Sequence, residues 1–276
     1  MNKTIILQNR AVISISGVDK RTFLQGLITN DINKASEKQA IYTFMLSPQG
    51  RFLYDFFIIE KNDELLIDCD LSRIDEIVQK LSFFKLRSKV EINKRSDLAA
   101  ASCLNADEFT EKEISFIDPR SEEMGFRGLI NYHPNGNENS DINEYHFRRY
   151  ELKLPDDSDL TYDKSFLLEF GFDSWNAIDY KKGCYVGQET TARMHYKGTI
   201  RKKVFLAEVI DSKIEKGSLI ENEGKKIGEV LSSILHQNKI IALVLIKNID
   251  NEGKEVNLKS LKLSPEMVLN SQIATR

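Results

Sequence analysis

Cysteines are few in this sequence and lie far apart. Its 276 residues contain three, Cys69, Cys103 and Cys184. An odd number with no close pair argues against a disulfide framework and favours a reducing compartment. The sequence also lacks a Cys-x-x-Cys pair and a cysteine–histidine cluster, so we predict no closed zinc or iron–sulfur site and no metal held by this chain alone.

Long apolar runs and an excess of positive charge are missing too. No segment approaches the roughly 20 apolar residues that span a membrane. The N-terminal segment is interrupted by Gln8, Asn9 and Arg10, unlike the apolar part of a signal peptide. The formal net charge of −3 argues against nucleic-acid binding through bulk charge. We therefore expect a cytoplasmic protein with no membrane contact and no direct nucleic-acid partner.

Enough apolar residues are present to build real cores. Hydrophobic residues make up 41% and charged residues 29%, as in soluble globular proteins, and the length predicts about two or three domains. Alternating apolar residues predict an antiparallel α+β region in the N-terminal part. Its expected elements are a hairpin over Thr4–Ser16, a helix capped by Asp19, strands over 41–46, 51–60 and 64–69, a helix over 72–86 and a strand over 88–92.

Beyond this region, the residue pattern changes first to a polar loop and then to short strands. The Asn-rich segment 131–143 predicts a loop, which is either a lid or simply a solvated surface loop. A helix over 143–152 follows, and Pro155 ends it. Four short strands punctuated by glycines, at 204–210, 226–232, 240–246 and 256–263, predict a small antiparallel β-barrel. We place the domain boundary between residues 198 and 199, giving domains 1–198 and 199–276.

The segment KKGCYVGQE, Lys181–Glu189, surrounds the third cysteine. Gly183 and Gly187 permit positive φ or a close backbone approach, and a helix is expected over 188–195. Cys184 would precede the helix N-terminus and follow two lysines, surroundings that favour a thiolate. The alternative, which these residues alone favour, is a small side chain in a glycine turn. Cys69 and Cys103 are expected in the core. No histidine is adjacent in sequence, so a Cys–His nucleophile is not indicated.

This segment resembles the signature of the YgfZ family of folate-binding proteins, which act in iron–sulfur cluster maturation and are relatives of the glycine-cleavage T-protein, an aminomethyltransferase. The resemblance implies a three-lobed, T-protein-like α+β fold with antiparallel sheets, in which two lobes form a folate cleft and the C-terminal β-barrel closes against it. It covers nearly the whole chain, and its further blocks are FLQGLITNDI (23–32), MLSPQGRFLYDF (45–56), FKLRSKV (84–90), DPRSEEMGFRG (118–128) and SFLLEFGFDSWNAIDYKKGCYVGQETTARM (165–194).

The resemblance also implies roles for single residues. Arg149 and Glu151 match an Arg-x-Glu element that ends in Pro, whose Glu faces the pterin ring in the T-protein. Lys153 stands where the family usually has Gly. The alternative for Glu151, which the residues alone favour, is an exposed helix residue. Asn30, Asp31, Tyr42 and Lys182 are further candidates for binding tetrahydrofolate. Their alternatives are helix termination for Asn30 and Asp31, a core position for Tyr42 and an exposed lysine for Lys182. The remaining motif residues are Gly183, Tyr185, Gly187, Gln188 and Glu189, around the candidate catalytic Cys184.

Three functions remain open at this point. The leading hypothesis is a tetrahydrofolate-binding accessory protein for assembly or repair of iron–sulfur clusters, with Cys184 acting on a cluster or partner protein. The second is a folate-dependent aminomethyl transferase that uses Asp75 or Glu151. The poor match around Asp75, whose alternative is a helix-surface residue, argues against true aminomethyltransferase activity. The third is a factor linked to tRNA modification through Lys197, Arg201, Lys202 and Lys203, whose alternative is a solvated basic face.

Overall fold

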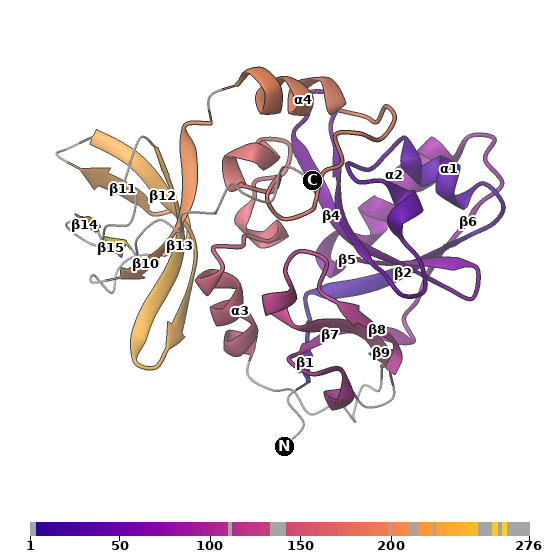
Figure 1. Ribbon diagram of the computed structural model, residues 1–276, viewed down its shortest axis with the longest axis horizontal. Helices are drawn as coiled ribbons and strands as arrows, with labels where there is room; N and C mark the ends of the chain where they lie inside the picture. The colour runs from indigo at the N-terminus through magenta and orange to yellow at the C-terminus, as the bar shows by residue number, and fades with distance from the viewer. Residues whose placement is uncertain are drawn as a thin grey trace, which may run out of the picture. The chain divides into compact units, whose positions relative to one another are not determined.

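The structure is a computed structural model that describes residues 4–109, 112–132, 142–198, 200–209, 215–222, 225–247, 256–258 and 261–263. The chain divides into two compact units (Figure 1). The first consists of residues 1–145 and 160–199, and the second of residues 146–159 and 200–276. The segment 146–159 is therefore grouped with the C-terminal sheet, although it precedes the last part of the first unit in sequence.

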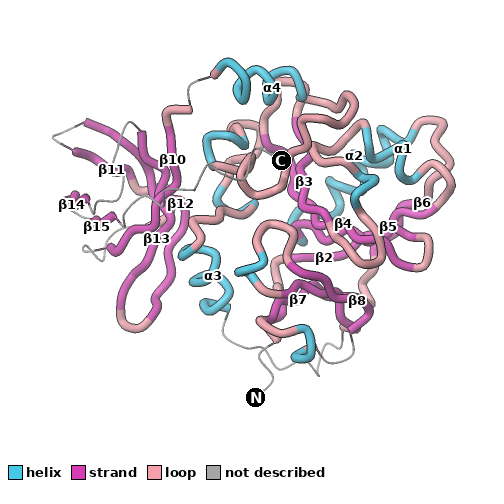
Figure 2. The backbone as a smooth tube through the Cα atoms, viewed as in Figure 1, coloured by secondary structure: helices cyan, strands magenta, loops and turns pink. Residues whose placement is uncertain are grey.

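The first unit contains a five-stranded antiparallel sheet in the order β3-β4-β5-β2-β6 (Figure 2). Two helices belong to it. The carboxylate of Asp19 occupies the predicted cap position of the first helix, but it accepts a hydrogen bond from the backbone N–H of Lys89 at 2.7 Å instead of capping. The elements are β2 (Arg10–Ser16), α1 (Lys20–Gln25), β3 (Ile41–Leu46), β4 (Phe52–Lys61), β5 (Glu64–Asp70), α2 (Ile74–Lys85) and β6 (Glu91–Lys94).

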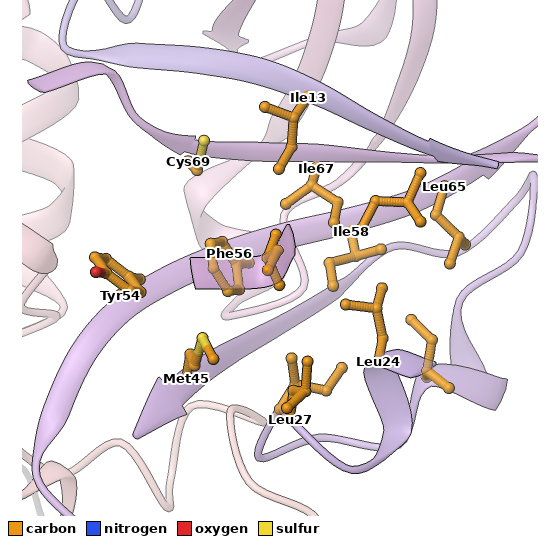
Figure 3. Packing of buried hydrophobic residues seen from close by; sticks show 14 of the residues in the cluster. Ile13, Leu24, Leu27, Met45, Tyr54, Phe56, Ile58, Leu65, Ile67 and Cys69 are labelled. Atoms are coloured by element: carbon orange, nitrogen blue, oxygen red, sulfur yellow. The ribbon is translucent and has the colours of Figure 1, made fainter. Parts of the chain in front are cut away.

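One face of this sheet builds the main core. The inward side chains of β2, β4 and β5 meet the apolar side of α1, as Figure 3 shows for Ile13, Phe56, Ile67 and Leu24. Cys69 is fully buried in the same cluster, as the sequence predicts. Alternate residues of a strand point to the same face of the sheet. An apolar residue at every second position is therefore enough to form this layer of the core.

A second antiparallel sheet of the first unit has the order β1-β7-β9-β8. The predicted N-terminal hairpin is wrong. β1 pairs with β7, whereas β2 pairs with β5 and β6 in the other sheet. The turn after β1, in which the N–H of Arg10 bonds the carbonyl of Leu7 at 2.9 Å, passes the chain between the two sheets. The elements are β1 (Ile5–Ile6), β7 (Leu98–Cys103), β8 (Lys112–Ile117) and β9 (Phe126–Asn131).

Two further helices follow. α3 (Ile142–Glu151) crosses the division between the units, and α4 (Gln188–Lys197) begins within the signature segment. Residues 133–141 of the predicted loop lie outside the described residues. No helix in the described part is long and apolar enough to span a membrane.

The second unit contains a six-stranded antiparallel sheet in the order β11-β12-β13-β10-β15-β14. The last expected strand is in fact two short strands that pair with each other. Among the described residues, no pairing joins β11 to β14, so closure of the expected barrel stays a prediction. The strands are β10 (Lys202–Val209), β11 (Leu219–Asn222), β12 (Lys225–His236), β13 (Lys239–Lys247), β14 (Val256–Leu258) and β15 (Leu261–Leu263).

Candidate functional site

The signature cysteine lies at an exposed turn between two buried anchors. Lys182 and Tyr185 are buried, whereas Gly183 and Cys184 between them are exposed. Cys69 and Cys103 are both buried, so Cys184 is the one cysteine whose thiol reaches solvent. The turn therefore exposes Cys184 to solvent, while the buried side chains of Lys182 and Tyr185 anchor the turn.

Lys182 is the inner anchor of this turn. Its ammonium donates hydrogen bonds to the backbone carbonyls of Gln25, Ile28 and Asn30, at 2.7, 2.7 and 2.8 Å. These carbonyls lie at and beyond the end of α1, where a helix leaves acceptors without partners. Burial lowers the pKa of Lys182 to about 8, against the attraction of Asp31 and Asp179. The alternative of an exposed lysine is wrong, because the apolar stem runs into the protein.

Asp179 holds the backbone that leads into the turn. One carboxylate oxygen accepts the N–H groups of Lys181 and Lys182 at 2.6 and 3.1 Å, and the other pairs with Lys34 at 2.7 Å. Burial alone would raise the pKa of Asp179, but the Lys34 ammonium and the Lys181 amide outweigh it and hold that pKa below its usual value. Asp179 is therefore ionised at neutral pH and orders the turn.

Two sequence blocks that carry the resemblance are bonded to each other upstream of this turn. The side-chain amide of Asn30 donates to the carbonyls of Tyr42 and Asn176 at 2.9 and 2.7 Å. The Thr29 hydroxyl donates to the Ala177 carbonyl at 2.7 Å, and the Asp179 amide to the Thr29 carbonyl at 3.0 Å. Asn30 thus joins the end of the block 23–32, β3 and the block 165–194 that contains the signature segment.

Downstream of the cysteine, Gly187 allows the chain to enter α4. Its φ is +84°, in the left-handed region that favours glycine. Gln188 is the first residue of the helix, and Glu189 is exposed in its first turn. Gly183, which would permit the same conformation, does not adopt it. Its φ is not positive, and a Cβ there would meet no atom within 4 Å.

A pocket of about 600 Å³ lies in the first unit, and its described lining reaches Ile178, shortly before the signature segment begins at Lys181. Asn30, Lys34 and Tyr42 line it together with Lys38, Asp118 and Asn176. Tyr42 is fully buried, and its hydroxyl donates to the Asp55 carboxylate at 3.2 Å. Asp31 is not among the described lining residues. It caps the short helical turn Ile32–Lys34 by accepting the Asn33 amide at 3.0 Å.

Sequence reasoning missed a buried ionic network behind Tyr42. Arg10 donates to Asp55 and Asp68, both at 2.7 Å, and Arg127 donates to the second oxygen of Asp68 at 2.6 Å. Burial alone would raise the pKa of Asp68, but Arg127 and Arg10 hold it below its usual value. Arg10, Asp55 and Asp68 lie on the face of the sheet opposite the main core, where a simple apolar alternation allows charged residues. The alternation therefore gives no signal of their burial, which depends on the second sheet that supplies Arg127.

The candidates Asp75 and Glu151 lie in other elements of the chain. Asp75 is on the surface of α2, with its side chain 88% exposed and paired with Lys94, so its helix-surface alternative is confirmed. Glu151 ends α3 in the second unit and is exposed. Within the described ranges, no group of three or more His, Cys, Asp or Glu side chains is placed to hold a metal ion.

The Arg-x-Glu segment itself is well ordered in the second unit. Buried Arg149 donates to the Leu154 carbonyl at 3.0 Å and to the carboxylate of Asp159. Lys153 has a φ of +54°, and the bonds Leu154 N to Arg149 O and Lys153 N to Tyr150 O form a Schellman helix end. This conformation explains why glycine suits position 153 better than lysine does.

Comparison with known proteins places these features in a family. No family model matches the chain. It is 32% identical over 230 residues to "Iron-sulfur cluster assembly factor IBA57, mitochondrial" of Mus musculus, covering 72% of this chain and 64% of that protein. The human protein of the same name is 30% identical over 234 residues, covering 74% and 66%. The chain belongs to the IBA57/YgfZ family.

The likeness to family members extends to Neurospora crassa, whose IBA57 homologue is 31% identical over 226 residues, covering 72% of this chain and 52% of that protein. The chain thus matches between about half and two thirds of the length of these relatives. The fold is T-protein-like. The crystal structure of glycine cleavage system aminomethyltransferase T from Bartonella henselae superposes with a TM-score of 0.72 at 14% identity, covering 96% of this chain and 85% of that one.

Proposed function

We propose that this protein is an accessory factor for iron–sulfur cluster assembly or repair that binds tetrahydrofolate and acts through Cys184. The observation that carries the proposal is the presentation of Cys184. One exposed thiol is held between Lys182 and Tyr185 in the segment that carries the family signature. A thiolate is the ligand that iron–sulfur clusters use most.

A single cysteine cannot complete the coordination of a cluster. The described residues contain no cluster of ligands to assist it. In the proposed function, Cys184 therefore supplies one thiolate to a cluster whose remaining ligands come from a partner protein, and the cluster is cargo. Iron–sulfur assembly proteins are the proposed partners.

The Asn30 pocket is the proposed place for tetrahydrofolate. Its volume of about 600 Å³ lies within the usual range of small-molecule sites. Lys34 and Lys38 at its edge fit the carboxylates of the folate glutamate tail, since charge-assisted hydrogen bonds to carboxylates are strong. Bound folate, a flat aromatic molecule, would fill the pocket among residues such as Asn30, Tyr42 and Asn176. The chain's own residues would orient it.

The aminomethyl transferase alternative receives less support. It needs a general acid or base beside the folate, and the candidate Asp75 lies exposed on α2 and outside the pocket lining. The tRNA alternative rests on Lys197, Arg201, Lys202 and Lys203, for which a solvated basic face remains the alternative. Turnover of an aminomethyl donor would support the transferase function. Binding of tRNA that is lost when the charges of these four residues are reversed would support the tRNA function.

Calorimetric titration with tetrahydrofolate under anaerobic conditions tests the pocket. We expect saturable binding to the wild type, at least tenfold weaker binding to Lys38→Glu, and unchanged binding to Lys181→Glu, an exposed lysine outside the pocket lining. Absence of saturable binding to the wild type, or equal effects of the two lysine variants, would refute folate binding here.

A second experiment tests the cysteine. Cys184→Ser should keep the urea midpoint of the wild type, because the thiol is exposed. It should fail to restore iron–sulfur enzyme activity in a host that lacks its own family member. Full restoration by Cys184→Ser would overturn the role of the thiol, whatever the outcome of the titration.

A further inference from the structure

A second pocket of about 540 Å³ lies in the first unit and shares no described lining residue with the Asn30 pocket. Its walls come from β1 and β2, the start of α2, the end of β6 and the start of β7. The volume falls in the range of small-molecule sites. Nothing in the proposed function uses this pocket.

The lining of this second pocket is mostly apolar. The side chains that form it include Ile6, Leu7, Val12, Leu71, Ile74 and Leu98. The charged residues of the described lining are Arg10, Lys94 and Arg95, with no aspartate or glutamate among them. A pocket whose wall is apolar and whose charged residues are all cations suits a molecule that has an apolar body and a negative charge.

The three cations are not equivalent. Arg10 is buried and held by Asp55 and Asp68, so it belongs to the wall. Lys94 and Arg95 instead pair with carboxylates that lie outside the pocket lining. Lys94 pairs with Asp75, and Arg95 with Asp97 and, at 3.4 Å, with Glu64. The side chains of these three partners are 88%, 60% and 36% exposed. Ion pairs at solvent-exposed positions contribute little to stability. A ligand anion can therefore replace these partners at little cost.

We propose that this pocket binds a small amphiphilic molecule with one anionic group, whose apolar body packs on the aliphatic wall and whose anion pairs with Lys94 and Arg95. The apolar wall supplies most of the affinity. The two cations select against neutral molecules of the same shape. The proposal is independent of the binding of folate, because the two pockets have separate linings.

Two fluorescent probes of the same ring system test the anion requirement. One is 8-anilinonaphthalene-1-sulfonate, and the other is N-phenyl-1-naphthylamine, which lacks the sulfonate. Titrated into the folded full-length chain, the sulfonate should bind saturably at one site and about tenfold more tightly than the neutral probe. Equal affinities, or sulfonate binding at several equivalent sites, would overturn the proposal.

Three variants locate the binding. Ala11→Phe places a ring in the pocket at a half-buried lining position and should abolish sulfonate binding. Lys94→Glu, at an exposed position that cannot compromise the core, should remove the preference for the anion. Ile117→Phe changes the edge of the Asn30 pocket and should leave both affinities unchanged. Sulfonate binding that survives Lys94→Glu at full strength would contradict the assignment, even where Ala11→Phe unfolds the chain.

Discussion

Gly50 and Gly187 lie against each other with no room for a side chain between them. A Cβ on Gly187 would lie 3.0 Å from the Gly50 Cα and 2.6 Å from the Ser47 carbonyl oxygen, and a Cβ on Gly50 would lie 2.7 Å from the Thr190 Cβ. Both glycines have positive φ, +79° and +84°. The turn before β4 and the start of α4 therefore pack tightly against each other, although they are far apart in sequence.

We predict that Gly187→Ala lowers the free energy of unfolding by about 2–4 kcal/mol, because the new methyl group meets backbone atoms and the left-handed φ becomes strained. The urea midpoint measures the loss. Gly183→Ala is the matched control in the same segment. Its Cβ would meet open space, so its midpoint should stay within about 0.5 kcal/mol of the wild type. Similar losses in both variants would contradict this packing.

Lys182→Met should destabilise the protein by about 2–4 kcal/mol, since three backbone carbonyls lose a charged donor. Urea unfolding at pH 7 measures this loss. The loop should also loosen, which faster hydrogen exchange of the Lys181–Val186 amides would reveal. An unchanged exchange rate together with an unchanged midpoint would show that the methionine stem alone anchors the turn.

The pH dependence of this variant follows from the pKa of Lys182. That pKa lies at about 8 in the folded protein and at about 10.4 in an unfolded chain. Between these values the unfolded state binds more protons, so the stability of the wild type rises with pH. The stability difference between wild type and Lys182→Met should therefore grow from pH 8 to pH 10. A constant difference over this window would show that Lys182 keeps an ordinary pKa.

Asp68→Asn should cost about 3–5 kcal/mol, because it leaves Arg10 and Arg127 buried without their shared carboxylate. Asp75→Asn, which breaks the exposed pair with Lys94, should cost less than about 1 kcal/mol. Chemical denaturation at pH 7 compares the two. The ranking would be refuted by a loss at position 75 that matches the loss at position 68.

Lys153→Gly should raise the free energy of unfolding by up to about 1 kcal/mol, since glycine adopts the left-handed conformation at the end of α3 without steric cost. Lys153→Ala removes the same side chain without gaining that freedom, and it separates the backbone effect from loss of the side-chain contacts. Thermal unfolding measures both variants. If alanine stabilises as much as glycine, the backbone explanation fails.

Local pattern predicted many elements of the first unit correctly. The spacing of apolar residues, with glycine and proline at the turns, correctly predicted five elements. These are the strands β3, β4 and β5, the helix α2 and the helix α4 that follows Cys184. The burial of Cys69 was predicted from its place in a strand, and that of Cys103 from its Ala-rich surroundings, and both are confirmed. Such features depend on residues a few positions apart, so they can be derived without knowing which strands pair.

Long-range pairing produced the differences. The separation of β1 from β2 depends on partners at β7, β5 and β6. The burial of Lys182 depends on carbonyls at the end of α1, more than a hundred positions earlier in the chain. The Arg10–Asp68–Arg127 network needs two sheets brought together. The local spacing of apolar residues does not predict such long-range contacts.

The sequence by itself determined the family, through a signature of glycines, a cysteine and polar residues whose spacing is specific, and the antiparallel α+β character of the chain. Only the tertiary structure decided how Cys184 is presented, that Lys182 is an internal anchor, and that Asn30 and Asn176, from two separate sequence blocks, line one pocket. The reason is physical. Local periodicity specifies which face of an element is apolar, whereas burial of a charge and formation of a pocket depend on which distant groups meet it.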